Sequence, residues 1–221
     1  MSFVTRCALT VLFAFSAVVL GDAARAAENI SKVNGSVKVE PGQQVGGVST
    51  VNGSVTIGAG ARAGAVETVN GSLKIEDKAV VGSAGTVNGS ITVGAEAEVQ
   101  KGVDAVNGSL TLRQGARVAG GLENVNGSIL VEGARVDGGI ETVKGDIRLA
   151  TGSHLTGGIH VEELKSSWWK GKDSHSPRIT IEQGVTVEGP LHFERAVDLY
   201  VAPGVNLPPV TGVQPQRFTL Q

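Results

Sequence analysis

The sequence predicts an all-β protein, a single-stranded parallel β-solenoid with a triangular cross-section and about nine coils. Three observations favour this fold. The tetrapeptide Val-Asn-Gly-Ser occurs six times at intervals of 18 or 19 residues. The aliphatic residues that follow each copy alternate with a period of two, which is typical of strands. The chain is 41% hydrophobic but only 4% aromatic, and it contains 32 glycines, so its core has to be thin and aliphatic.

The first 26 residues are predicted to be a secretory signal peptide. Arg6 precedes an apolar run over residues 8–20, and Ala24 and Ala26 supply the small residues that a signal peptidase reads. Cleavage is expected between Ala26 and Ala27, which places the protein in the periplasm or outside the cell. A membrane anchor is the alternative, but the run is shorter than the roughly 20 residues that span a bilayer. We expect no transmembrane segment in the mature chain.

The mature chain is expected to lack both disulfides and strong charge. Its only cysteine, Cys7, lies inside the predicted signal peptide, so the fold has to be stable without cross-links. Removal of Arg6, Arg25 and Asp22 leaves 17 basic residues against 20 acidic ones. This weakly acidic balance argues against a nucleic-acid partner.

The repeat defines the solenoid domain, which we predict over residues 27–205. The six copies begin at Val33, Val51, Val69, Val87, Val106 and Val125, and a degenerate copy begins at Val143. Each copy leads into an aliphatic-x-aliphatic step and then a glycine-rich segment, so three short strands fit in each period. In the early copies aliphatic residues recur every six positions, as in Val39, Val45 and Val51. Such short strands bury their apolar faces only when successive coils stack.

The Asn-Gly step is predicted to form one corner of each coil, because glycine accepts a positive φ and asparagine is the next best residue. Repetition places the asparagines in a file, about 4.8 Å apart, where their amides can hydrogen-bond from coil to coil. The predicted corner ladder comprises Asn34, Asn52, Asn70, Asn88, Asn107 and Asn126. Asn-Gly-Ser also matches the glycosylation acceptor, but six glycans in one file would crowd one another, and turn chemistry explains the motif.

An inserted loop is predicted at residues 165–178 (KSSWWKGKDSHSPR), where the interval between equivalent coil positions grows by about fourteen residues. Loops that leave a solenoid corner often carry specificity. The loop contains Trp168 and Trp169 beside Lys170 and Lys172. Two interpretations stay open: the tryptophans bind a partner, such as an envelope polysaccharide or protein, or they fold back over an apolar side of the coils.

The two ends of the solenoid are predicted to differ. Residues 206–221 are rich in proline, which cannot donate to a sheet ladder, so they are expected to form a cap or an extended tail. Few mature residues precede the first coil. Its open strands are therefore a predicted self-association site, centred on Val33, Val37 and Val39, which would make the protein a homo-oligomer.

Two segments resemble the bactofilins, the polymer-forming bacterial cytoskeletal proteins. They are residues 138–147 (GGIETVKGDI) and residues 179–184 (ITIEQG), the latter continuing into Val187-Glu188-Gly189. The resemblance implies a triangular parallel β-helix of similar coil length and a scaffold or assembly function. This chain differs in its predicted export signal and in its regular Asn-Gly-Ser corner, whereas typical bactofilins lie against the inner face of the membrane.

The residues favour a structural or adhesive protein over an enzyme. Hexapeptide acyltransferases and γ-class carbonic anhydrases also have 18-residue coils, but they depend on histidines. Here His154 and His160 could sit on adjacent faces, yet zinc would need a third ligand, for example from a neighbouring chain. We therefore predict no catalytic residue, no metal site and no cofactor. The alternative is a carbohydrate-active β-helix enzyme that uses Glu162 or His175.

Overall fold

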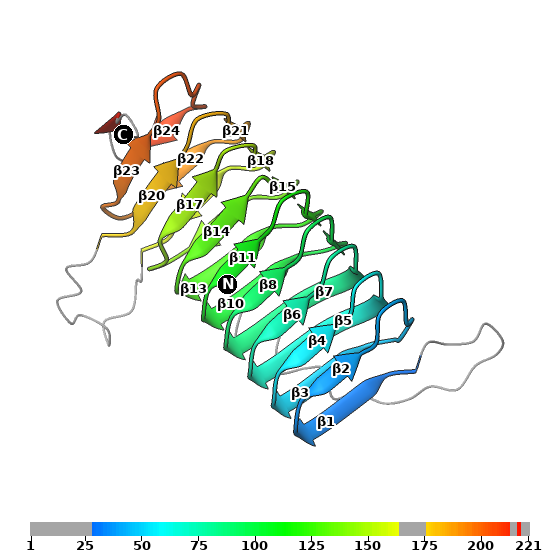
Figure 1. The fold of residues 1–221 in the computed structure, drawn as a ribbon. Helices are drawn as coiled ribbons and strands as arrows, with labels where there is room; N and C mark the ends of the chain where they lie inside the picture. Colours follow the sequence, from blue (N-terminus) through cyan, green and yellow to red (C-terminus); the bar gives the residue numbers. More distant parts are fainter. Residues whose placement is uncertain (1–27, 164–175, 213–215, 218–221) are drawn as a thin grey trace.

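The structure is a computed structural model that describes residues 28–163, 176–212 and 216–217. Within these ranges every regular element is a β-strand, and no helix is long and apolar enough to cross a membrane. The strands stack into a parallel β-solenoid of about nine coils, which confirms the predicted fold class (Figure 1). The predicted signal peptide lies outside the described residues.

Each coil contributes one strand to a ten-stranded parallel sheet, which we call the first face. Its strands are β2 (Val37–Val39), β4 (Val55–Ile57), β6 (Leu73–Ile75), β8 (Ile91–Val93), β11 (Leu110–Leu112), β14 (Ile129–Glu132), β17 (Ile147–Ala150), β20 (Arg178–Ile181), β23 (Asp198–Val201) and β25 (Gln216–Arg217). These strands begin just after the Asn-Gly-Ser corner, where the sequence places its aliphatic-x-aliphatic steps.

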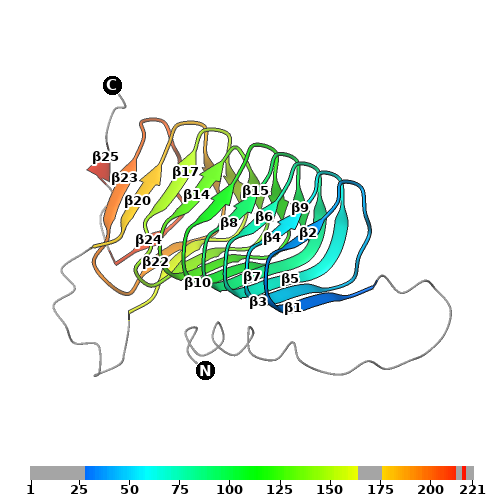
Figure 2. The same cartoon turned by 60° about the horizontal axis from the view of Figure 1, so that its bottom comes forward.

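A fifteen-stranded sheet forms the other two faces. The second face contains β9 (Glu98–Val99), β12 (Arg117–Val118), β15 (Arg135–Val136), β18 (His154–Leu155) and β21 (Thr186–Val187). The third face contains β1 (Ile30–Asn34), β3 (Val48–Asn52), β10 (Val103–Asn107), β13 (Leu122–Asn126), β16 (Ile140–Thr142), β19 (Ile159–Val161), β22 (Leu191–Phe193) and β24 (Val210–Thr211). β5 (Arg62–Asn70) and β7 (Val80–Asn88) pair along both faces and join them into one sheet (Figure 2).

The register keeps equivalent residues of successive coils side by side. Asn34 pairs with Asn52 and Asn52 with Asn70, so each step along the solenoid is one repeat. The interval between Asn88 and Asn107 is 19 residues long. The extra residue lies at the corner between β9 and β10, which is one residue longer than the equivalent stretch of β7.

The core is a column of aliphatic side chains that point inward from the three faces. Leu73, Ile75 and Val81 are examples from a single coil, each at most 1% exposed. The predicted six-residue spacing of core residues is wrong on the third face. There the inward residues are Val48 and Thr50, while Val51 faces outward and is only half-buried. The strand ends at the asparagine, and period-two alternation directs its first and third residues inward.

Close contact between coils requires the corner glycines in addition to the positive φ that the sequence predicts, which only part of them adopt. A Cβ built on Gly71 would lie 2.0 Å from the carbonyl oxygen of Gly53, and one on Gly108 would lie 1.8 Å from that of Gly89. Neither Gly71 nor Gly108 has a positive φ. Gly35 and Gly127, with φ of +106° and +130°, do occupy the left-handed region. Only a residue without a side chain allows the corners to stack at the strand spacing.

The chain after residue 205 continues the stack. β24 pairs with β22, and β25 pairs with β23, while Leu207 and Val210 pack against the core. The described part of the proline-rich segment therefore covers the C-terminal end of the solenoid. The inserted loop is narrower than predicted, because Pro177 is buried and Arg178 already begins β20.

Candidate functional site

The third face carries a continuous file of outward-facing residues that pair in register from coil to coil, all polar except Gly85, which we call the polar file. It comprises Ser31, Ser49, Glu67, Gly85, Asp104, Glu123, Glu141, His160, His192 and Thr211. Acidic residues occupy its middle and histidines its C-terminal part. Because parallel register brings these positions about 4.8 Å apart, the file concentrates ionisable groups on one side of the rod.

The acidic middle of the polar file contains two carboxyl groups with raised pKa values. Burial, together with a smaller effect from the charge of Glu67, raises the pKa of Asp104 to about 6. Burial also raises the pKa of Glu67. Gly85 lies between them in the file, and the nearest atom to a Cβ built there would be Cγ of Glu67, 4.0 Å away. Because Gly85 has no side chain, no side chain of the file separates the two carboxyl groups.

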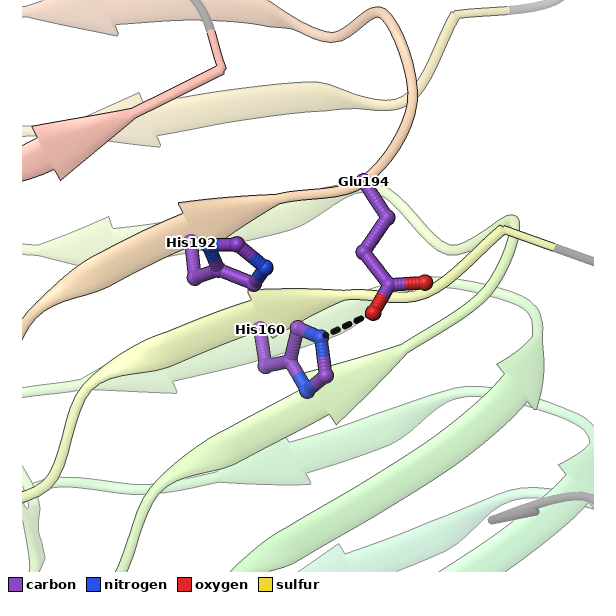
Figure 3. A group of neighbouring side chains, drawn as sticks. All are labelled: His160, His192 and Glu194. Atoms are coloured by element: carbon purple, nitrogen blue, oxygen red, sulfur yellow. Dashed lines mark ion pairs between the residues drawn. The ribbon is translucent and has the colours of Figure 1, made fainter.

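The C-terminal part of the polar file brings two histidines together. The ring centroids of His160 on β19 and His192 on β22 lie 5.2 Å apart, with a tilt of 44°. Nε2 of His160 lies 3.4 Å from Oε1 of Glu194, which follows β22. Figure 3 shows the two rings and this carboxylate converging above the sheet. Glu141 and Glu162 each place a carboxylate oxygen within 4.8 Å of a ring nitrogen of His160.

Sequence reasoning missed this cluster because the inserted loop separates its histidines by 32 positions. No other coil interval in the chain is that long, so His160 and His192 do not look like neighbours. The signal that could have found them is their equivalent setting, Ile159-His160-Val161 and Leu191-His192-Phe193, which pair residue by residue. His154 and His160 do lie on adjacent faces, as the sequence suggests: His154 is in β18 on the second face, where it pairs with Glu188 at 2.9 Å.

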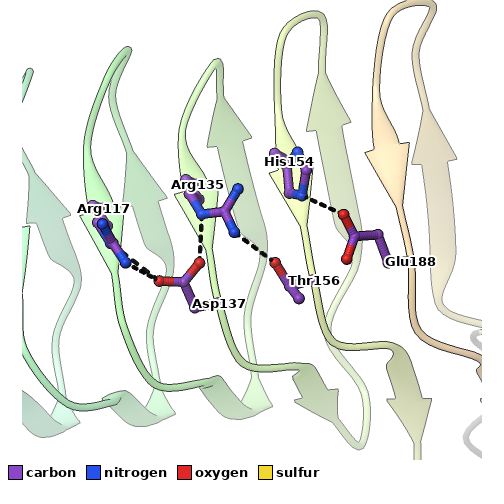
Figure 4. Close-up of polar contacts among 6 residues, drawn as sticks. All are labelled: Arg117, Arg135, Asp137, His154, Thr156 and Glu188. Atoms are coloured by element: carbon purple, nitrogen blue, oxygen red, sulfur yellow. Dashed lines mark hydrogen bonds and ion pairs between the residues drawn. The ribbon is translucent and has the colours of Figure 1, made fainter.

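A second polar group, of arginines and carboxylates, lies on the second face (Figure 4). Asp137 accepts hydrogen bonds from Arg117 and Arg135, and Arg135 also donates to Oγ1 of Thr156. Desolvation by itself would raise the pKa of Asp137, but the hydrogen bonds from both guanidinium groups outweigh it and hold the pKa below its ordinary value. These pairs tie successive coils together, and such exposed pairs add little to stability.

The asparagines of the corner form hydrogen bonds from coil to coil. Nδ2 of Asn52 donates to Oδ1 of Asn34 at 3.0 Å, and three further bonds continue the series through Asn70 and Asn88 to Asn107. Asn126 pairs in register with Asn107, but among the described residues it makes no side-chain bond to it.

Inside the same corner, hydroxyl groups satisfy backbone carbonyls. Thr50, Thr68 and Thr86 each donate to the carbonyl of the corner glycine one coil earlier, at 2.9 to 3.1 Å. All three are at most 3% exposed. These bonds make the repeated corner a structural element, because buried carbonyl groups need partners.

The predicted self-association residues have different environments. Val33 is 59% exposed, whereas Val37 and Val39 are buried at 3% and 0%. Lys32 occupies the inward position that Thr50 holds in the next coil, and its Nζ donates to the carbonyl of Ser36. The predicted partner-binding residues Trp168, Trp169, Lys170 and Lys172, as well as His175, lie outside the described residues.

A surface hollow of about 800 Å³ lies away from the histidines, at the corner between the first and second faces. Its lining includes Arg113 and Glu132, which form an ion pair at 2.8 Å, and Glu182, which pairs with Arg148 at 2.6 Å. Since these charges neutralise one another, the hollow offers no chemistry comparable to the histidine cluster.

Comparisons with known proteins give no family. No protein-family model matches the chain, and searches among curated proteins and solved structures found no match.

Proposed function

We propose that this chain is an exported, non-enzymatic β-solenoid that serves as a scaffold or adhesive rod at the cell envelope and self-associates through its N-terminal coil. About nine coils at the strand spacing give a rod roughly 40 Å long. The resemblance of residues 138–147 to the bactofilins supports an assembly role, and the predicted signal peptide supports export.

The observation that carries the proposal is the difference between the two ends. In the described residues β1 pairs only with β3, and β2 only with β4, whereas β24 and β25 cover the C-terminal end. Ile30 donates its N–H to Gly47 in the second coil, so the alternating peptide groups of Ser31 and Val33 point away from β3. An open strand edge of this kind is a template for pairing with a second chain.

The geometry of such a pair follows from symmetry, and one charge opposes it. Two copies related by a two-fold axis would place β1 antiparallel to β1 of the second copy. Lys32 points inward at this end, and an inward charge on an edge strand disfavours edge pairing. We therefore expect a dimer held by backbone hydrogen bonds rather than by a continuous apolar core.

Light scattering of the purified protein over a range of concentrations tests this proposal. The wild type should be dimeric or larger. Val33→Pro should shift it toward the monomer, because proline removes an outward N–H, and Lys32→Thr should strengthen association. Lys74→Thr is the matched control, since its register neighbours Thr56 and Thr92 are already threonines. A monomeric wild type at high concentration, or equal behaviour of Val33→Pro and the control, would overturn the proposal.

A carbohydrate-active enzyme is the second candidate, favoured by the two carboxyl groups of the polar file. Glycoside cleavage uses one carboxylic acid that keeps its proton near neutral pH and a second carboxylate. The pKa of about 6 for Asp104, beside Glu67, fits such a pair. Incubation of the protein with envelope polysaccharides should yield new reducing ends that Asp104→Asn abolishes; if no reducing ends form, the enzymatic reading is wrong.

A further inference from the structure

We propose that His160, His192 and Glu194 form a binding site for a divalent transition-metal ion, with Zn²⁺ as its natural occupant. Two imidazoles and one carboxylate are a common protein ligand set for zinc, and they leave a fourth position for water or another ligand. One ligand atom of each residue lies within 4.8 Å of the others. The site is independent of the proposed self-association, which concerns the opposite end of the rod.

The contact between His160 and Glu194 has the separation expected for two ligands of one ion. Nε2 of His160 lies 3.4 Å from Oε1 of Glu194. Two atoms that are each about 2.0–2.1 Å from a tetrahedral zinc lie roughly 3.3–3.4 Å apart. Within the described residues this Nε2 is buried and has no hydrogen-bond partner. A buried nitrogen without a partner is costly, and a metal ion would satisfy it.

The second histidine is held in the form that a metal needs. Oγ1 of Thr211 lies 3.4 Å from the carbonyl of Leu191, to which it donates, and 2.8 Å from Nδ1 of His192. When the hydroxyl proton is given to that carbonyl, Nδ1 of His192 donates to Thr211, and this tautomer leaves the lone pair on Nε2 for a metal. Metal-bound histidines are commonly fixed through their other nitrogen in this way. Figure 3 shows the His192 ring directed toward His160 and Glu194.

Nearby charge favours a cation at this position. Glu141 and Glu162 lie beside His160, so with Glu194 three carboxylates surround two imidazoles. Carboxylates next to a ligating histidine orient the ring and raise its basicity. The nitrogen ligands select a transition metal over Mg²⁺ or Ca²⁺, which prefer oxygen atoms only.

Titration of the untagged full chain with ZnCl₂, followed by calorimetry at pH 7.5, tests the site. We expect one zinc ion per chain with a Kd of about 10 µM or tighter, unaffected by millimolar Mg²⁺. His192→Ala and Glu194→Gln should each weaken zinc binding at least tenfold. Both residues lie at the surface, and circular dichroism verifies that the strands persist. His154→Ala, which removes a histidine from another His–Glu pair, is the matched control.

The results separate a built site from adventitious binding. A wild-type Kd weaker than about 100 µM, a loss of less than tenfold in either variant, or an equal loss in His154→Ala would overturn the proposal.

Discussion

Replacement of Asn124, a buried residue whose side chain bonds to a corner carbonyl, should stabilise the protein. Asn124 occupies the inward position that Thr86 holds two coils earlier, and it is 0% exposed. Its Nδ2 donates to the carbonyl of Gly108 at 2.9 Å, as the threonine hydroxyl does in the earlier coils. Its Oδ1, however, is buried and has no hydrogen-bond partner among the described residues. Asn124→Thr would keep the useful bond and remove the unsatisfied oxygen.

The expected gain follows from the cost of that oxygen. A buried polar atom without a partner costs about 1–3 kcal/mol. Threonine has nearly the same volume as asparagine and a higher strand propensity, so the replacement should leave little strain. We expect the free energy of unfolding to rise by about 1–2 kcal/mol. For a chain of this length the corresponding increase in Tm is about 2–8 °C.

Thermal and urea unfolding, followed by circular dichroism, measure the effect. The reverse change, Thr86→Asn, is the matched control, because Thr86 is equally buried and makes the equivalent bond to Gly71. It should lower stability by a similar amount. If Asn124→Thr is no more stable than the wild type while Thr86→Asn is neutral, the hydrogen-bond argument for the corner is incorrect.

Three further predictions concern the polar file and the corner. The pKa of Asp104 is raised to about 6 in the folded chain from an ordinary value of 3.8, so its contribution to the free energy of unfolding is present below about pH 4 and is lost as the pH rises through 6. Asp104→Asn should remove this loss and be about 1–2 kcal/mol more stable than the wild type at pH 7 in urea unfolding. A variant whose stability depends on pH as the wild type's does would count against the pKa shift. Asn70→Ala removes two ladder bonds and should cost about 1–2 kcal/mol, whereas Asn126→Ala should cost less than half as much in the same assay; equal losses would show that the ladder adds nothing. Gly71→Ala should lower the free energy of unfolding by about 3 kcal/mol or prevent folding, because its Cβ meets a backbone oxygen at 2.0 Å. Gly85→Ala, whose Cβ would have no atom closer than 4.0 Å, is the control and should keep the wild-type Tm.

The fold could be predicted from the sequence because the spacing of the repeated motif equals the length of one coil. The spacing of the Asn-Gly-Ser motif predicts the parallel register that pairs Asn34 with Asn52, and alternation predicts the inward residues of the first face. The six-residue spacing of aliphatic residues failed on the third face, where hydrophobicity pointed to Val51 although Thr50 faces the core. A buried threonine is recognisable only once its carbonyl partner, the glycine of the previous coil, is in place.

The histidine cluster could not be predicted, since its geometry depends on how the chain re-enters the stack after the insertion. His160 and His192 become neighbours because β22 pairs directly with β19, and the sequence alone leaves the length of the excursion uncertain by several residues. For the same reason the predicted loop, residues 165–178, includes Arg178, which the structure assigns to β20.

In the described residues each strand pairs only with strands of the adjacent coils, so the length of the solenoid is set by the number of coils. The distance from the open edge at β1 to the histidine cluster is a whole number of strand spacings, each about 4.8 Å. Duplication or deletion of an 18-residue unit, such as residues 64–81, would move one end relative to the other by a single step while each remaining coil kept an equivalent neighbour. Length in this protein can therefore change in discrete increments without redesign of the core.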